Sequence, residues 1–165
     1  MKFIKTEISD VYIIEPSVFG DNRGYFLESF NLEKFEENVY PIKFVQDNES
    51  KSSKGVLRGL HFQKPPSDQA KLVRCIEGRV MDVAVDIRKG SLTYGKHVAI
   101  ELTGENKRQL FVPRGFAHGF SVLSDTAVFA YKVDNRYAPE SDSGIRYDDK
   151  ELNIDWGLNK ERIQL

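Results

Sequence analysis

The sequence predicts an all-β fold of the sandwich or barrel class. Most of its 165 residues fall into short apolar or alternating runs that end at glycine, proline or polar turns. Many short strands at regular spacing are typical of sandwiches and barrels. Helix signals are few, and a content of 40% hydrophobic and 30% charged residues is that of an ordinary globular protein.

The expected elements follow from these runs and their breaks. One helix is predicted over residues 31–37, because Asn31 can cap it and helix-forming residues follow. One or two helical turns are expected after Asp148. With no repeat or linker, residues 1–165 are predicted to form a single domain with a few short peripheral helices. In chain order, the expected strands span residues 11–15, 24–30, 56–62, 71–76, 79–87, 97–102, 109–112, 116–123 and 127–133.

Composition also excludes several classes of partner and chemistry. A net charge of −1 argues against a nucleic-acid partner. No apolar run approaches the ~20 residues of a membrane span, so no membrane partner and a cytoplasmic location are expected. Cys75 is the single cysteine, which excludes an intramolecular disulfide and favours a buried, inert thiol. The phosphate-binding glycine motifs and the nucleophile elbow are missing from the sequence.

Polar side chains interrupt faces that should be apolar. Residues i and i+2 of a strand share a face, and by this rule His118 lies among Phe116, Phe120 and Val122. Burying such a group alone is costly. Taken singly, each fits an ordinary structural role, but together they predict a polar-lined cavity in the barrel. The other polar residues placed on apolar faces in this way are Glu28, Lys71 and Tyr131.

A second histidine, His61, lies in the run Val56-Leu-Arg-Gly-Leu-His-Phe-Gln63. Arg58 precedes it by three residues, and arginine is suited to bidentate contact with phosphate. Arg23, in a turn, is either a second anion ligand or a surface residue. An alternative is a metal held by His61, His118 and a carboxylate, although the histidine spacing does not place two ligands on one strand or helix.

Seven motifs occur along the chain in a recognisable order. Through these motifs the chain closely resembles the dTDP-4-dehydrorhamnose 3,5-epimerase family from its N-terminus to about Trp156. The resemblance implies a cupin-type jelly roll, a homodimer that exchanges N-terminal strands, and no metal or redox cofactor. The motifs are Phe19-Gly-Asp-Asn-Arg-Gly-Tyr-Phe26, Phe44-Val-Gln-Asp-Asn48, Val56-Leu-Arg-Gly-Leu-His-Phe-Gln63, Lys71-Leu-Val-Arg74, Asp82-Val-Ala-Val-Asp86, Pro113-Arg-Gly-Phe-Ala-His-Gly-Phe120 and Tyr131-Lys132.

The resemblance also implies roles by position. His61 matches the general base, and Tyr131 matches the acid on the opposite face of the sugar. Lys71 and His118 match groups near the 4-keto oxygen of dTDP-4-keto-6-deoxyglucose, and Tyr137 matches an aromatic that stacks on thymine. The remaining matches to substrate-binding residues are Arg23, Glu28, Gln46, Asp47, Asn48, Arg58 and Asp142, the last standing where many members have Glu.

One departure from the family pattern concerns the carboxylate behind the base. Family members usually continue with a segment containing Ser-x-Lys-Asp, whose Asp pairs with the base histidine, whereas the sequence here ends at Leu165. Either the chain is shortened as given or another carboxylate serves. The protein is expected to be an isomerase that inverts C3 and C5 of dTDP-4-keto-6-deoxy-D-glucose. The alternatives are a mono-epimerase at C3, a non-catalytic dTDP-sugar-binding cupin, and a metal-dependent cupin oxygenase.

Overall fold

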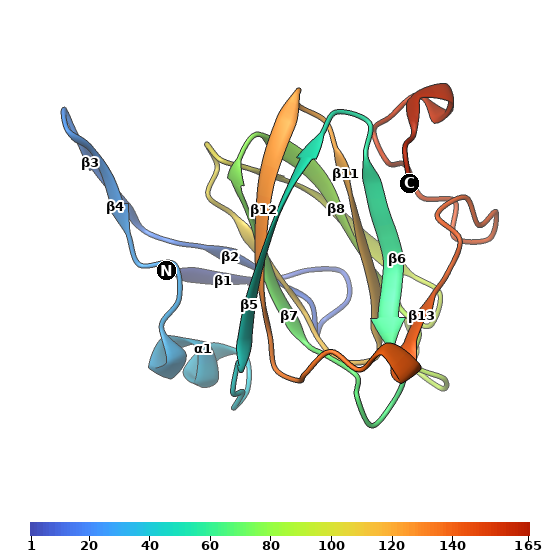
Figure 1. The fold of residues 1–165 in the computed structure, drawn as a ribbon. Coiled ribbons are helices and arrows are strands. Elements are labelled where there is room, and N and C mark those ends of the chain that lie inside the picture. The colour runs from blue at the N-terminus through green and yellow to red at the C-terminus, as the bar shows by residue number, and fades with distance from the viewer.

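Two antiparallel sheets face each other and enclose the interior of the protein (Figure 1). The computed structural model describes residues 1–165. One sheet has six strands in the order β1 (Lys2–Lys5), β2 (Tyr12–Glu15), β10 (Gln109–Val112), β7 (Lys71–Glu77), β12 (Thr126–Val133) and β5 (Gln46–Ser53). The other has five strands in the order β13 (Asp142–Gly144), β6 (Leu57–Gln63), β11 (Phe116–Val122), β8 (Arg79–Asp86) and β9 (His97–Thr103). The all-β prediction is confirmed.

The main core lies between the two sheets. Alternate residues of β12 point inward, and Ala127, Phe129 and Val133 are buried. The ring of Phe129 stacks on that of Phe120 from β11 at a centroid distance of 4.1 Å, which joins the sheets directly. Apolar burial of this kind supplies most of the favourable free energy of folding.

A second cluster forms where α1 (Leu32–Asn38) packs on the outside of the six-stranded sheet. The Asn31 side chain accepts a hydrogen bond from the Lys34 backbone N–H and caps the helix, as the sequence predicts. Phe35 is 1% exposed and is the buried residue of this short helix. Its ring meets those of Phe3, Phe30, Phe44 and Phe111.

A two-stranded ribbon, β3 (Val18–Asp21) and β4 (Gly24–Leu27), projects away from the barrel (Figure 1). Every residue of β3 is exposed. Phe19 and Phe26 are 66% and 69% exposed, which is unusual for two neighbouring phenylalanines. The ribbon also corrects the expected strand 24–30, because β4 ends at Leu27 and leaves Glu28 beyond the strand.

The hydrophobic pattern of the sequence does not predict four of the strands, which are β1, β3, β5 and β13. β1, β3 and β13 are only three or four residues long. β5 has eight residues, Gln46-Asp-Asn-Glu-Ser-Lys-Ser-Ser53, and none is apolar. It forms because its backbone pairs with β12 along its whole length at the edge of the sheet.

The C-terminal segment packs back on the barrel with little regular structure. After Asp148 it contains one 3₁₀ turn, Lys160–Arg162, where one or two helical turns were expected. Trp156 is 5% exposed, and its indole N–H donates to the Tyr147 carbonyl at 2.9 Å. No helix of the structure is long and apolar enough to cross a membrane.

The aromatic cluster under α1 yields a test of stability. Replacing Phe35 by Ala should lower the free energy of unfolding by about 3–5 kcal/mol, because a buried ring leaves a cavity among four neighbouring rings. Chemical denaturation monitored by circular dichroism measures this loss. Leu92→Ala is the control, since Leu92 is 99% exposed and should change stability by less than about 0.5 kcal/mol. Equal effects of the two substitutions would contradict the packing described here.

Candidate active site

A cavity of about 490 Å³ opens between the two sheets, and most of the residues that line it are polar. The polar-lined cavity expected from the sequence is therefore confirmed. Strands β5, β7 and β12 of one sheet and β6, β11 and β13 of the other contribute to it. The lining comprises Gln46, Asn48, Glu49, Ser50, Arg58, His61, Phe62, Gln63, Gln69, Lys71, His118, Phe120, Phe129, Tyr131, Tyr137 and Asp142.

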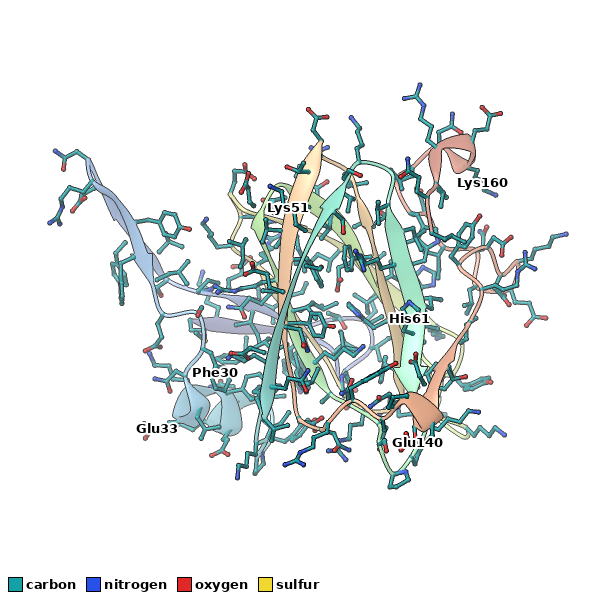
Figure 2. All side chains as sticks on the ribbon, in the orientation of Figure 1. Phe30, Glu33, Lys51, His61, Glu140 and Lys160 are labelled. Atoms are coloured by element: carbon teal, nitrogen blue, oxygen red, sulfur yellow. The ribbon has the colours of Figure 1, made fainter.

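His61 lies on β6 (Figure 2), directly across the strand pair from His118 on β11. The register of this pair shifts between His118 and Phe120. At the shift the two backbones approach closely, because a Cβ built on Gly59 would lie 2.5 Å from the Cα of Gly119. Gly59 also has φ +141°, which L side chains rarely adopt. The two glycines thus allow β6 and β11 to bring both imidazoles to one wall of the cavity.

The surroundings of His61 favour its neutral form. The imidazole remains accessible from the cavity, but its partial burial is the largest influence on its pKa and lowers it. The Asp142 carboxylate opposes this effect and raises the pKa, whereas the charges of Lys71, His118 and Arg58 lower it further. A neutral imidazole can accept a proton, so His61 is suited to act as a base near neutral pH.

A buried carboxylate, Asp82 of β8, contacts His118 on β11 and influences Lys71 on β7 through its charge. Asp82 is 0% exposed, and its Oδ1 lies 2.8 Å from Nε2 of His118. Its Oδ2 is buried without a hydrogen-bond partner. Burial lowers the pKa of the Lys71 amine, while the negative charges of Asp82 and Asp142 raise it. Lys71 and His118 both line the cavity, whereas Asp82 is fully buried behind its wall.

Asp82 received no role from the sequence, although a signal for it was present. It stands between Val80 and Ala84, two members of the main core, and therefore on an inward face of β8. The face rule that indicates His118 and Lys71 indicates Asp82 equally.

Tyr131 occupies β12, in the sheet opposite His61. Burial raises the pKa of its phenol, with a smaller opposite effect from Arg58, so the hydroxyl is protonated at neutral pH. The Lys71 ammonium lies 5.9 Å from the centroid of the Tyr131 ring. A proton acceptor and a proton donor thus face the cavity from opposite sheets.

Tyr137 and Asp142 lie at the exposed side of the cavity, in the segment that follows β12. Tyr137 is 58% exposed, and its hydroxyl is 3.5 Å from Oδ2 of Asp142. Arg58 is exposed on β6 and donates from Nε to the Ser52 hydroxyl at 3.2 Å. Gln46 and Asn48 reach the cavity from β5, and their amides hydrogen-bond to each other at 2.8 Å.

The structure places three of the expected substrate-binding residues outside this cavity. Asp47, between Gln46 and Asn48 on β5, points to the opposite face and pairs with Lys132 at 2.9 Å. Arg23, at the tip of the ribbon, pairs with Asp21 and remains 86% exposed. Glu28 pairs with Lys34 of α1 at 2.8 Å. No three His, Cys, Asp or Glu side chains gather as a group that could hold a metal ion.

Comparisons with known proteins agree with this geometry. The family model described as dTDP-4-dehydrorhamnose 3,5-epimerase matches residues 5–164. A Shigella flexneri protein of that name is 61% identical over 157 residues, which are 94% of this chain and 87% of the relative. A Streptomyces niveus protein named dTDP-4-dehydrorhamnose 3-epimerase is 39% identical over 90% of this chain and 72% of its own length.

Solved structures agree as closely. The dTDP-4-dehydrorhamnose 3,5-epimerase of Elizabethkingia anophelis has a TM-score of 0.95 and 57% identity, covering 99% of this chain and 90% of its own. The Legionella pneumophila enzyme, in complex with dTDP-4-keto-L-rhamnose, has a TM-score of 0.95 and 52% identity, covering 99% and 86%. The cupin-type jelly roll implied by the sequence is confirmed by these structures. Matched along nearly its whole length in sequence and in fold, the chain belongs to the dTDP-4-dehydrorhamnose 3,5-epimerase family.

Proposed function

We propose that the protein epimerises C3 and C5 of dTDP-4-keto-6-deoxy-D-glucose to give dTDP-4-keto-L-rhamnose. The observation that carries this proposal is the placement of His61 and Tyr131 on opposite sheets, facing one cavity. Inversion at carbon needs a proton taken from one face and returned to the other. Family membership and the ligand of the Legionella pneumophila relative support the choice of sugar.

Proton removal is assigned to His61. A C–H next to a ketone is weakly acidic, and its loss places negative charge on the 4-keto oxygen as an enolate. The lowered pKa of His61 keeps the imidazole available as an acceptor. Lys71 and His118 lie on the same cavity, and a cation or hydrogen-bond donor near the keto oxygen stabilises the charge that develops there.

Proton return is assigned to Tyr131. Its phenol remains protonated at neutral pH because burial raises the pKa. The same base and acid serve both carbons if the sugar presents C3 and C5 in turn. Arg58 is suited to the diphosphate and Tyr137 to the thymine ring, so that binding far from the reacting carbons orients the sugar.

We also propose that two copies of the chain exchange their N-terminal ribbons. Phe19 and Phe26 are exposed on the ribbon, and a two-stranded ribbon is marginally stable alone. Arg23 lies at the tip of this ribbon and Glu28 directly after it, and neither lines the cavity of its own chain. A ribbon donated to a second copy would supply them to that copy's cavity.

The cytoplasmic location stays a prediction.

Solvent-exchange experiments separate the roles of the two residues. His61→Asn should reduce kcat/KM by a factor of about 10²–10⁴, because a general base contributes rate of this size, and it should remove deuterium incorporation at C3 and C5. Tyr131→Phe should retain incorporation but lose the inverted product, because only His61 can then return the proton. Mass spectrometry and NMR of the sugar in D₂O report both. Full inversion by either variant would refute the assignment.

The environment of His61 also predicts a pH dependence. The acid limb of kcat/KM should lie below the ordinary imidazole pKa of about 6.5, because the lowered pKa keeps His61 neutral as pH falls. Asp142→Asn removes the charge that raises this pKa, so the limb should move to still lower pH. Asp125→Asn is the matched control, since Asp125 is 99% exposed and pairs with Lys54. A limb that moves upward in Asp142→Asn would contradict this electrostatic account.

Mixed dimers test the exchange of ribbons. Arg23→Ala and His61→Asn chains that carry different affinity tags are co-expressed, and the dimer that contains one chain of each is purified. If Arg23 acts on the partner's cavity, one of the two sites is intact and about half of the wild-type activity returns. If Arg23 acts on its own cavity, both sites carry a defect and activity stays at the level of the single variants. A monomer in gel filtration would also refute the exchange.

A further inference from the structure

We propose that Gln63 is a positioning residue that fixes Tyr137 at the mouth of the cavity and thereby sets the affinity for the nucleotide base. This inference rests on the proposed function, in which Tyr137 meets the thymine ring. Gln63 ends β6, two residues after His61, and its side chain is 7% exposed. It reaches the edge of the cavity from the strand that carries the proposed base.

The amide of Gln63 is bonded on both sides of Tyr137. Its Nε2 donates to the Arg136 carbonyl at 3.1 Å, and its Oε1 accepts from the Ala138 N–H at 2.7 Å. The second N–H donates to the Ser67 carbonyl at 2.6 Å. Both amide hydrogens and the amide oxygen are therefore used on backbone groups, and two of the three contacts flank Tyr137.

Two further amides fasten the same segment to the loop before β7. Gln69 donates to the Asn135 carbonyl at 2.8 Å. Asn135 donates in turn to the Pro66 carbonyl at 3.1 Å and to the Asp68 carbonyl at 3.3 Å. Gln63, Gln69 and Asn135, here called the amide clamp, thus hold residues 135–138 through side-chain hydrogen bonds rather than through a strand ladder.

Tyr137 depends on this clamp because it has little packing of its own. Its side chain is 58% exposed, and its hydroxyl makes a long contact of 3.5 Å with Asp142. The backbone on either side therefore sets the direction of its Cα–Cβ bond and so the region that the ring can occupy. A ring already held in place loses less conformational freedom when a base stacks on it, so affinity is greater than for a mobile ring.

The placement of Gln63 also couples the two ends of the substrate site. One end of β6 carries His61, which faces the reacting sugar in the proposed mechanism, and the next inward residue fixes Tyr137. The spacing between the base-stacking ring and the catalytic imidazole is thus determined within a single strand and its side-chain contacts.

Substitution by Met tests the clamp while keeping the size of the side chain. Gln63→Met should weaken dTDP binding and raise KM by about tenfold while kcat changes less than about twofold, because the loss is one of preorganised binding. Isothermal titration with dTDP measures the affinity. Inorganic pyrophosphate, which has no base, should bind Gln63→Met and the wild type equally.

A double-mutant cycle with Tyr137→Ala distinguishes positioning from general damage. If Gln63 acts through the ring, Gln63→Met should weaken dTDP binding no further once the ring is removed. Ser121→Ala is the matched control, because it also deletes a buried side-chain bond to a distant backbone carbonyl, that of Trp156, at 2.6 Å. It should lower thermal stability and leave dTDP affinity unchanged.

Several results would overturn the inference. These are an unchanged dTDP affinity in Gln63→Met, an equal loss of pyrophosphate affinity, or a full additional loss in the Tyr137→Ala background. If Gln63→Met fails to fold, Gln69→Leu is used instead, because it removes a single bond of the amide clamp. Gln69→Leu should also weaken dTDP binding, and an unchanged affinity would count against the clamp. A wild-type protein that neither binds dTDP nor exchanges solvent deuterium would refute the proposed function itself.

Discussion

The buried carboxylate of Asp82 is the constraint around which the interior is organised. Removing a carboxylate from water is expensive unless cations and hydrogen-bond donors compensate it. Here His118 bonds one oxygen, and the field of Asp82 raises the pKa of Lys71 against the opposite effect of burial. Asp82 and His118 belong to one sheet and Lys71 to the other. Asp82 thus acts on side chains of both sheets at the point where polar residues, rather than an apolar core, line the space between them.

The barrel divides into two regions with different physical purposes. Around Phe120 and Phe129 the sheets interdigitate with stacked rings and apolar neighbours. Beyond Phe129 the same strand continues to Tyr131, and the lining becomes polar. The packed region provides stability, so the neighbouring region can keep a cavity and partly desolvated titratable groups. Burial shifts the pKa values of His61, Lys71 and Tyr131, and titratable groups shifted in this way within a cavity suit proton transfer.

Much of the fold and part of the site could be predicted because alternation in a strand reports which face is buried. That rule identified Lys71, His118 and Tyr131, and it could have identified Asp82. It says nothing about β5, whose eight residues are all polar and which forms through its pairing with β12. Motif resemblance proposed Gln46, Asp47 and Asn48 together, whereas the pleat sends Asp47 to the opposite face. The contacts of Gln63 join residues more than 70 positions apart, and no local pattern reveals such a pairing.

The close contact between Gly59 and Gly119 limits how this site can evolve. A Cβ on Gly59 would meet the Gly119 backbone at 2.5 Å, and one on Gly119 would meet the Arg58 carbonyl at 2.8 Å. Neither atom belongs to a flexible side chain that could move aside. Any larger residue would separate the two strands and shift both imidazoles together. Variation of substrate preference must therefore arise in side chains that line the cavity or its mouth. Positions 59 and 119 cannot accept a residue larger than glycine without moving the backbone.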